Sequence, residues 1–277
     1  MQLAWGISLS AVTAMAQNDD SELLFDLQGH VATVTFNRPR VHNAITWAMY
    51  RRLIDLCDQV DADDGIRVMV LRGAGKAFSA GTDISQFREL KDPADALEYE
   101  QKIDKTLDRV ESVTKPTIAV LRAACTGGGA LIALACDFRY SHTDLRFGVP
   151  IARTLGNCLS MRNYARLVDL LGPAQTKSLL MLARLLDADE ALKLGVVHQI
   201  VPSEQMDSHV RKVAARLCDL APLTLQATKE AVRRTLAQRQ LAREDGHDLI
   251  RSCYMSEDFA AAVQAFLEKR RHEWTGR

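Results

Sequence analysis

The stretch 125-CTGGGALIALACD-137 places three consecutive glycines directly before an apolar helical run. Glycines let a chain turn sharply, and the first turn of a helix carries backbone N–H groups without intrahelical partners. Two such groups that converge on one point can stabilise the negative charge of an enolate or a tetrahedral oxyanion. Alternatively, glycines 127–129 only allow the helix to pack closely against a strand. The stretch alone leaves both interpretations open.

A second glycine-containing loop, 73-GAGKAFSAGTD-83, follows the short apolar segment 67–73. The loop does not match a dinucleotide fingerprint, because Phe78 occupies the third glycine position. No lysine follows glycines 127–129 as a Walker-type phosphate loop requires. Both loops can direct backbone N–H groups into a common site, one after Gly81 and the other within the glycine run.

Strand and helix patterns alternate around these loops. Residues 22–27 and 31–36 alternate apolar and polar side chains, which predicts a β-hairpin. Thr46 is a candidate cap of the next helix. Further elements are expected as a strand at 67–73, a helix at 93–113, a strand at 117–121 and helices at 203–219, 222–238 and 256–271. The repetition of strand and helix predicts an α/β architecture with parallel strands, and the chain ends in helices alone.

Composition excludes several classes of partner. The 277 residues include 35 basic and 35 acidic side chains, so no net charge favours nucleic acid or an anionic membrane. The six cysteines lack the paired spacing of a zinc site or redox dithiol, and we expect reduced thiols, no metal and a cytoplasmic protein. The first residues end in an Ala-Met-Ala stretch but lack a basic n-region, so residues 1–20 are predicted to be disordered or irregular rather than a signal peptide. We also expect no membrane span.

Several motifs occur in a characteristic order. They are 37-NRPRVHNAIT-46, 76-KAFSAGTDI-84, 115-KPTIAVLRAACTGGGALIALACDFRY-140, 147-FGVP-150, 172-GPAQTKSLL-180, 187-DADEALKLGVVHQIVP-202 and 256-SEDFAAAVQAFLEKR-270. In this order and at this spacing the sequence resembles the crotonase, or enoyl-CoA hydratase/isomerase, family from about Glu22 to its C-terminus.

The resemblance implies an α/β fold, a crotonase-like spiral of repeated ββα units with a C-terminal helical region. Residues 21–202 would form the acyl-CoA-binding core, and residues 203–277 a helical subdomain for oligomerisation. The expected assembly is a homotrimer or a dimer of trimers. The expected ligand is an acyl-CoA, with coenzyme A as part of the substrate and no separately bound cofactor.

The resemblance also assigns roles to individual residues. The backbone N–H groups of Thr82 and Gly128 would form the oxyanion hole. Arg40 would lie near the nucleotide phosphates, although it can equally be a solvated loop arginine. Backbone carbonyls near Val41, Ala80 and Ile84 would receive the adenine amino group. Lys269 would reach the nucleotide, with a solvated helix face as its alternative.

The sequence departs from the family pattern at two positions. Hydratases of this family use two glutamates around the water that they add, one shortly after the glycine run and one after the Phe-Gly-x-Pro turn. This chain has Leu131 and Ile151 there, and neither side chain can transfer a proton. Asn157 and Cys158 are the nearby candidates to replace them, although Cys158 can also be a packed thiol.

Three functions remain open from the sequence. One is an acyl-CoA enzyme that stabilises an enolate with other acid and base groups, such as an isomerase, hydrolase, carbon–carbon lyase or decarboxylase. Another is an enoyl-CoA hydratase with substitute residues. The last is a non-catalytic acyl-CoA-binding protein that has kept the site and lost the catalyst.

Overall fold

The structure is a computed structural model that describes residues 21–238 and 243–277. The predicted irregular segment 1–20 lies outside these residues. A six-stranded sheet has the order β1-β2-β3-β4-β6-β8. These strands are β1 (Leu23–Gln28), β2 (Val31–Phe36), β3 (Val68–Gly73), β4 (Thr117–Leu121), β6 (Phe138–Ser141) and β8 (Gln199–Ile200). Only β1 and β2 pair antiparallel, as the predicted hairpin, and the other pairs are parallel.

The central parallel strands β3 and β4 are buried on both faces. On β3, Val68 and Val70 belong to one hydrophobic cluster while Met69 and Leu71 belong to the other. Side chains alternate between the faces of a strand, so each face packs against its own layer. The cluster of Val68 and Val70 includes Met206 of helix α7 (Met206–Asp219).

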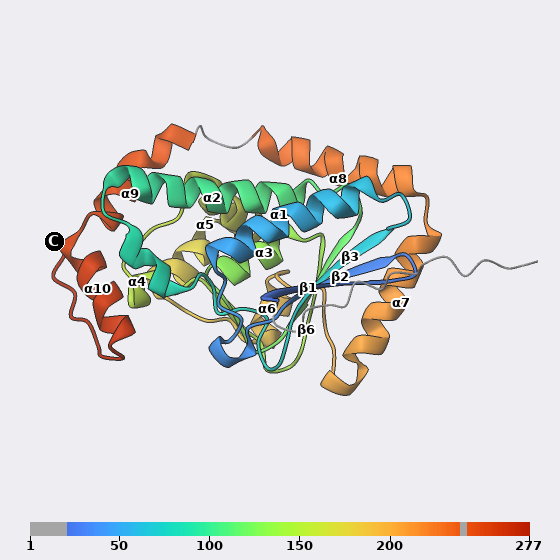
Figure 1. The fold of residues 1–277 in the computed structure, drawn as a ribbon, viewed down its shortest axis with the longest axis horizontal. Coiled ribbons are helices and arrows are strands. Elements are labelled where there is room, and N and C mark those ends of the chain that lie inside the picture. Colours follow the sequence, from blue (N-terminus) through green and yellow to red (C-terminus); the bar gives the residue numbers. More distant parts are fainter. Residues whose placement is uncertain (1–20, 239–242) are drawn as a thin grey trace, which may run out of the picture.

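The larger cluster lies on the opposite face, beneath α1 (Trp47–Ala62), α2 (Pro93–Glu111) and α3 (Gly128–Ala135). In Figure 1, α1 and α2 run along one side of the strands and α7 lies on the other. Thr46 caps α1, as the sequence predicts, because its side chain accepts a hydrogen bond from the Met49 N–H. The mainly parallel sheet, with helices on both faces, confirms the expected α/β class.

A small second sheet pairs β5 (Ala124–Thr126) with β7 (Arg146–Gly148) in parallel. It positions the glycine run, because the Gly127 N–H donates to the Gly148 carbonyl at 2.9 Å. Gly127 has a φ of 54°, in the left-handed region that glycine tolerates. The chain therefore turns directly from β5 into α3. After β7 the chain forms the short helix α4 (Ile151–Thr154), then α5 (Met161–Met181) and α6 (Ala188–Lys193).

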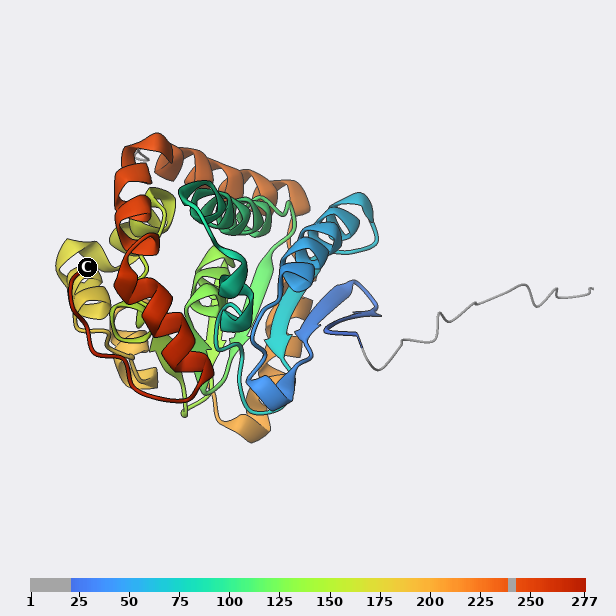
Figure 2. The ribbon, with the colours of Figure 1, turned by 60° about the vertical axis from the view of Figure 1, so that its left-hand side comes forward.

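The C-terminal helices contribute to both clusters. Beyond α7 come α8 (Pro222–Ala237), α9 (His247–Tyr254) and α10 (Glu257–Leu267). Tyr254 and Phe259 lie in the larger cluster, where α9 packs against α2. Figure 2 shows α10, in red, crossing near the segment η2 (Ile84–Glu89), which it contacts through Phe259 and Phe87. Helix α9 is absent from the sequence-based expectation.

The apolar face of α10 is mostly covered by its own chain. Phe259 and Val263 are buried, while Phe266 is 49% exposed. Helix α8 differs, because none of its residues is buried. The division at residue 202 and the oligomerising role of residues 203–277 stay predictions.

Candidate active site

The two glycine-containing loops come together. Strand β5 pairs with Ser79, whose N–H donates to the Ala124 carbonyl at 3.0 Å and whose carbonyl accepts from the Thr126 N–H at 2.9 Å. Gly81, with a φ of 99°, follows this pairing. A Cβ atom at Gly81 would lie 3.0 Å from the Thr126 carbonyl oxygen and 3.3 Å from the Gly128 nitrogen. Glycine is therefore needed where the two loops touch.

The backbone nitrogen atoms of Thr82 and Gly128 lie on either side of this contact. A Cβ atom built on Gly128 would lie 3.6 Å from the Thr82 nitrogen. Within residues 21–238 and 243–277, neither N–H has an acceptor in the hydrogen bonds of the chain. Gly128 is the first residue of α3, where the positive end of the helix dipole adds to the donor. The sequence-predicted pair of donors is thus brought together, and its oxyanion role stays a prediction.

The two positions at which the resemblance implies glutamates, Leu131 and Ile151, have apolar surroundings. Leu131 is 2% exposed and belongs to the larger cluster. Ile151 is half-buried at the start of α4 and packs against the same cluster. Both side chains act in packing, so neither position offers a proton donor or acceptor.

Asn157 and Cys158 have different surroundings. The Asn157 side-chain amide donates to the Tyr254 hydroxyl at 3.0 Å, while its buried Oδ1 has no hydrogen-bond partner in the described structure. The Cys158 thiol is buried and shares a hydrogen bond with Cys253, and this bond together with burial raises its pKa. A thiol that stays protonated is a weak nucleophile. This favours the interpretation of Cys158 as a packed thiol.

A chain of hydroxyl groups adjoins the two N–H groups. The Tyr50 hydroxyl of α1 lies 2.8 Å from Thr82 Oγ1, which lies 3.2 Å from the Tyr99 hydroxyl of α2. A Cβ atom on Gly128 would lie only 2.3 Å from the Tyr50 hydroxyl. Tyr50 therefore requires glycine at position 128. The Thr82 side chain, which has no role in the predicted oxyanion hole, connects the two tyrosines.

The hydroxyl chain leads to a buried carboxyl group. Tyr254 of α9 packs against Tyr99 with ring centroids 5.8 Å apart and interacts with its hydroxyl, and the Tyr254 hydroxyl donates to Glu100 Oε1 at 2.6 Å. The second carboxyl oxygen of Glu100 accepts from the Ser160 N–H at 2.9 Å. Burial, assisted by the nearby Asp104 carboxylate, raises the pKa of Glu100 from 4.5 to about 8 against these hydrogen bonds. Glu100 is therefore a buried acid that titrates near neutral pH.

The sequence motifs do not point to Tyr50, Tyr99, Glu100 or Tyr254. Glu100 carries a detectable signal, because it lies four residues after Ala96 and three before Ile103 on the buried face of α2. A carboxyl group on the apolar face of an amphipathic helix is rare unless it has partners. Its partner Tyr254 is 154 positions away, and only the fold reveals that pairing.

Most of the predicted nucleotide-binding residues lie on the neighbouring segments around η1 (Pro39–Val41) and η2, whereas Lys269 lies beyond the end of α10. Arg40 and Val41 are exposed on η1, and the Ala80 N–H donates to the His42 carbonyl at 2.9 Å just beyond it. The Ala80 carbonyl accepts from the Thr126 hydroxyl at 3.1 Å. Ile84 begins η2 after Asp83, whose side chain caps that segment. Lys269 is exposed beyond the end of α10.

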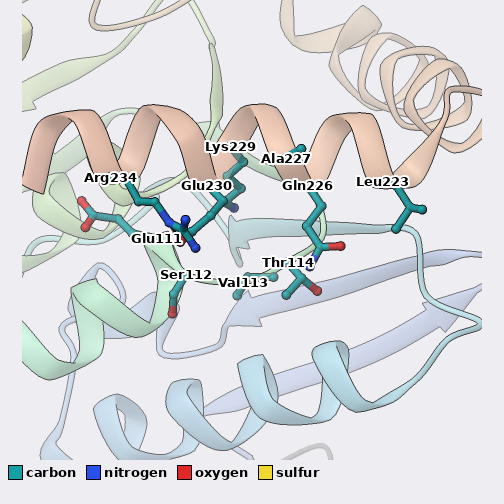
Figure 3. A pocket seen from close by; sticks show the side chains of 10 residues that line it. All are labelled: Glu111, Ser112, Val113, Thr114, Leu223, Gln226, Ala227, Lys229, Glu230 and Arg234. Atoms are coloured by element: carbon teal, nitrogen blue, oxygen red, sulfur yellow. Dashed lines mark hydrogen bonds and ion pairs between the residues drawn. The ribbon is translucent and has the colours of Figure 1, made fainter.

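Two hollows lie elsewhere, beneath α8. One has a volume of about 470 Å³ and lies between α8 and the end of α2, with Glu111, Lys229 and Arg234 in its wall (Figure 3). The other, of about 500 Å³, shares Glu111 and Lys229 and reaches the end of α3. Neither includes Thr82 or Gly128. Both lie against α8, none of whose residues is buried, and the backbone donors mark the candidate site instead.

The described residues contain no group of three or more histidine, cysteine, aspartate or glutamate side chains arranged to hold a metal ion. Among the same residues, no helix combines the length and apolar character that crossing a bilayer requires.

Comparison with known proteins gives a consistent result. The family model described as enoyl-CoA hydratase/isomerase matches residues 26–277. The chain is 30% identical to the short-chain-enoyl-CoA hydratase of Clostridium acetobutylicum, over 91% of this chain and 97% of the relative. It is 30% identical to the 2,3-dehydroadipyl-CoA hydratase of Escherichia coli, over 93% and 100%. A crystal structure of an enoyl-CoA hydratase/carnithine racemase from Magnetospirillum magneticum is 32% identical, with a TM-score of 0.76 over 93% of this chain and 96% of that chain.

Proposed function

The chain belongs to the enoyl-CoA hydratase/isomerase family, and we propose that it stabilises the enolate or oxyanion of an acyl-CoA thioester with the backbone N–H groups of Thr82 and Gly128. The observation that carries the proposal is that these two neighbouring groups have no acceptor within the described residues. Donors held by the fold need no reorganisation when charge develops on the thioester oxygen. Each such donor contributes ~2.7–4 kcal/mol to transition-state stabilisation in enzymes that use one.

We further propose that the protein is a poor hydratase. Hydration needs one group to activate water and another to deliver a proton, and Leu131 and Ile151 can do neither. The reactions that remain open are those that pass through an enolate without adding water, with isomerisation, carbon–carbon cleavage and decarboxylation among them. The acyl-CoA itself is the only ligand that these reactions require.

The nucleotide end of coenzyme A is proposed to bind beside η1. Arg40 would approach the phosphates, while carbonyls near Val41, Ala80 and Ile84 would receive the adenine amino group. The hydrogen bond from the Ala80 N–H to the His42 carbonyl supports this grouping by joining the two loops. A carbonyl oxygen has two lone pairs, so the bond from Thr126 still leaves the Ala80 carbonyl able to accept another. Lys269 is proposed as a more distant contact to the nucleotide.

A second candidate function is enoyl-CoA hydration with substitute residues. The relatives from Clostridium acetobutylicum and Escherichia coli are named as hydratases. Glu100 supports this alternative, because it is an ionisable carboxyl group connected to Thr82 through hydroxyls. The two candidates differ in whether water is added to the double bond.

Hydration and binding measured side by side test the proposal. Steady-state hydration of crotonyl-CoA would be compared with calorimetric binding of butyryl-CoA, using a glutamate-bearing hydratase as the control. General acid and base groups contribute about 10²–10⁴-fold each, so we expect hydration to be slower by several orders of magnitude while the thioester still binds. Hydration at the rate of the control enzyme would establish the second candidate instead. Absence of thioester binding would refute both.

A further inference from the structure

Glu100 is isolated from solvent yet connected by hydrogen bonds to the candidate site. The carboxyl group is buried in α2, and its two oxygens have partners from different parts of the chain, the Tyr254 hydroxyl and the Ser160 N–H. Burying an ionisable group costs free energy, whereas an apolar side chain would pack on this helix face without that cost. The hydrogen bonds show how the carboxyl group is satisfied, but the helix does not need it for packing.

The path through Tyr254 connects Glu100 to the backbone donors. Starting at Glu100, they pass through Tyr254, Tyr99, Thr82 Oγ1 and Tyr50, with the Tyr50 hydroxyl against Gly128. Each hydroxyl both donates and accepts, so the series can pass a proton along without carrying a charge at any one oxygen. Burial raises the pKa of Tyr50, Tyr99 and Tyr254 above the usual tyrosine value. These tyrosines therefore stay neutral, and only the carboxyl group can store or release the proton.

One further polar atom beside this relay has no hydrogen-bond partner in the described structure. Asn157 donates to the Tyr254 hydroxyl, yet its own Oδ1 is buried without a partner in the described structure. Buried acceptors are nearly always satisfied, and an unsatisfied one commonly marks a place where water or a ligand binds. The unpaired oxygen thus lies beside the relay between Glu100 and the candidate oxyanion hole.

We propose that Glu100 is the proton reservoir of this site and exchanges the α-proton of the bound acyl-CoA through Tyr254, Tyr99, Thr82 and Tyr50. This inference rests on the proposed function, because the enolate needs the Thr82 and Gly128 donors. Glu100 acts through other groups and is a positioning residue rather than a group that touches the substrate.

The proton-transfer step balances without a further reactant. The α C–H bond breaks, and its electron pair forms the carbon–carbon double bond of the enolate while negative charge moves to the thioester oxygen. The Tyr50 hydroxyl oxygen takes the proton as it passes its own to Thr82 Oγ1, and the transfer continues to the Glu100 carboxylate. The reverse step returns a proton to carbon and restores the thioester.

Several titratable groups face Glu100 or its relay. Asp104 is on the same helix, Tyr254 comes from α9, Tyr50 from α1, and Cys158 and Tyr164 from the chain around the start of α5. Of the nearby groups, Cys253 also titrates close to neutral pH, because a hydrogen bond with Cys158 lowers its pKa to about 7. A test of Glu100 therefore needs a control at Cys253.

Hydrogen–deuterium exchange at carbon isolates the step. Butyryl-CoA would be incubated with the full-length protein in D2O, and α-deuteration followed by mass spectrometry between pH 6 and 9.5. The carboxylate is the base, so the wild-type rate should rise with pH and level off above a midpoint near 8. Glu100→Gln should slow exchange roughly 10²–10⁴-fold and abolish the pH step. Tyr254→Phe should also slow exchange, while Cys253→Ser should keep both the rate and the step.

Other outcomes would overturn the inference. If Glu100→Gln exchanges at the wild-type rate, or slows equally at every pH while the step persists, Glu100 has only a structural role. The infrared carbonyl stretch of bound [1-¹³C]butyryl-CoA separates this failure from that of the proposed function. A lowered stretching frequency in the wild type without any α-exchange contradicts the relay alone. An unchanged frequency in a bound thioester contradicts the oxyanion assignment on which the relay rests.

Discussion

Glu100 illustrates how one residue can combine a cost to stability with a chemical role. The residue is 3% exposed, and this burial raises the pKa of its carboxyl group. An unfolded chain would return the group to its ordinary pKa. The difference between the two states links the stability of the fold to pH.

Glu100→Gln should reveal this linkage. Since the folded pKa is raised from 4.5 to about 8, the unfolded state loses its proton first. The contribution of Glu100 to the free energy of unfolding is therefore fully present below pH 4.5. It is lost as pH rises toward 8, by about 1.4 kcal/mol per pH unit in this window. We expect thermal unfolding to show that the melting temperature of Glu100→Gln rises relative to that of the wild type between pH 5 and pH 8.5.

Glu98→Gln, on the exposed face of the same helix, is the matched control and should show no such trend. A constant difference between Glu100→Gln and the wild type across this range would contradict the raised pKa. Asp104 also has a raised pKa, and because its carboxylate interacts with that of Glu100, its response to the substitution is part of the measured difference.

Individual residues of the site were unequally predictable from the sequence. The candidate oxyanion donors at Thr82 and Gly128 follow local motifs, and the fold brings them together as expected. The hydroxyl relay does not follow from local pattern, because it joins Tyr50, Tyr99 and Tyr254 from three separate helices. The local sequence predicts only that each of these tyrosines is a buried aromatic residue. The partners of their hydroxyl groups lie far away in the sequence.

At the scale of secondary structure, periodicity predicts strands and long helices well. The strand 117–121 has the bounds of β4, and the helix 93–113 corresponds to α2. Periodicity does not predict helix α9, because the helix has only eight residues. Its burial depends on packing against α2 rather than on a long apolar stripe. The close packing of α7 on the sheet is equally non-local.

Met206→Ala tests whether α7 is an integral part of the core. Met206 is 1% exposed between α7 and the sheet, so truncation should leave a cavity and lower the free energy of unfolding by about 2–5 kcal/mol. Urea unfolding should remain a single transition with a lower midpoint. Leu223→Ala on α8, where the side chain is 77% exposed, should change stability by less than about 0.5 kcal/mol. A separate early transition in Met206→Ala would instead indicate a detachable C-terminal unit.

The molecule as a whole has the fold of its family, and the chain matches the family model over residues 26–277. The two proposed donors are backbone N–H groups, and glycine at positions 81 and 128 lets the loops that carry them approach each other. Around them lie the apolar side chains of Leu131 and Ile151 and the proposed hydroxyl relay to Glu100. The homotrimer or dimer of trimers implied by the resemblance stays a prediction.

The carbonyl stretch of a bound thioester tests the central claim most directly, because it reports on the atom that Thr82 and Gly128 are proposed to hold. Difference infrared spectra of [1-¹³C]butyryl-CoA and the unlabelled thioester would be recorded with the wild-type protein and in buffer. Two converging donors should polarise the carbonyl and move its stretch to a lower frequency than in water. A bound thioester whose carbonyl absorbs at the same frequency as in buffer would contradict the account.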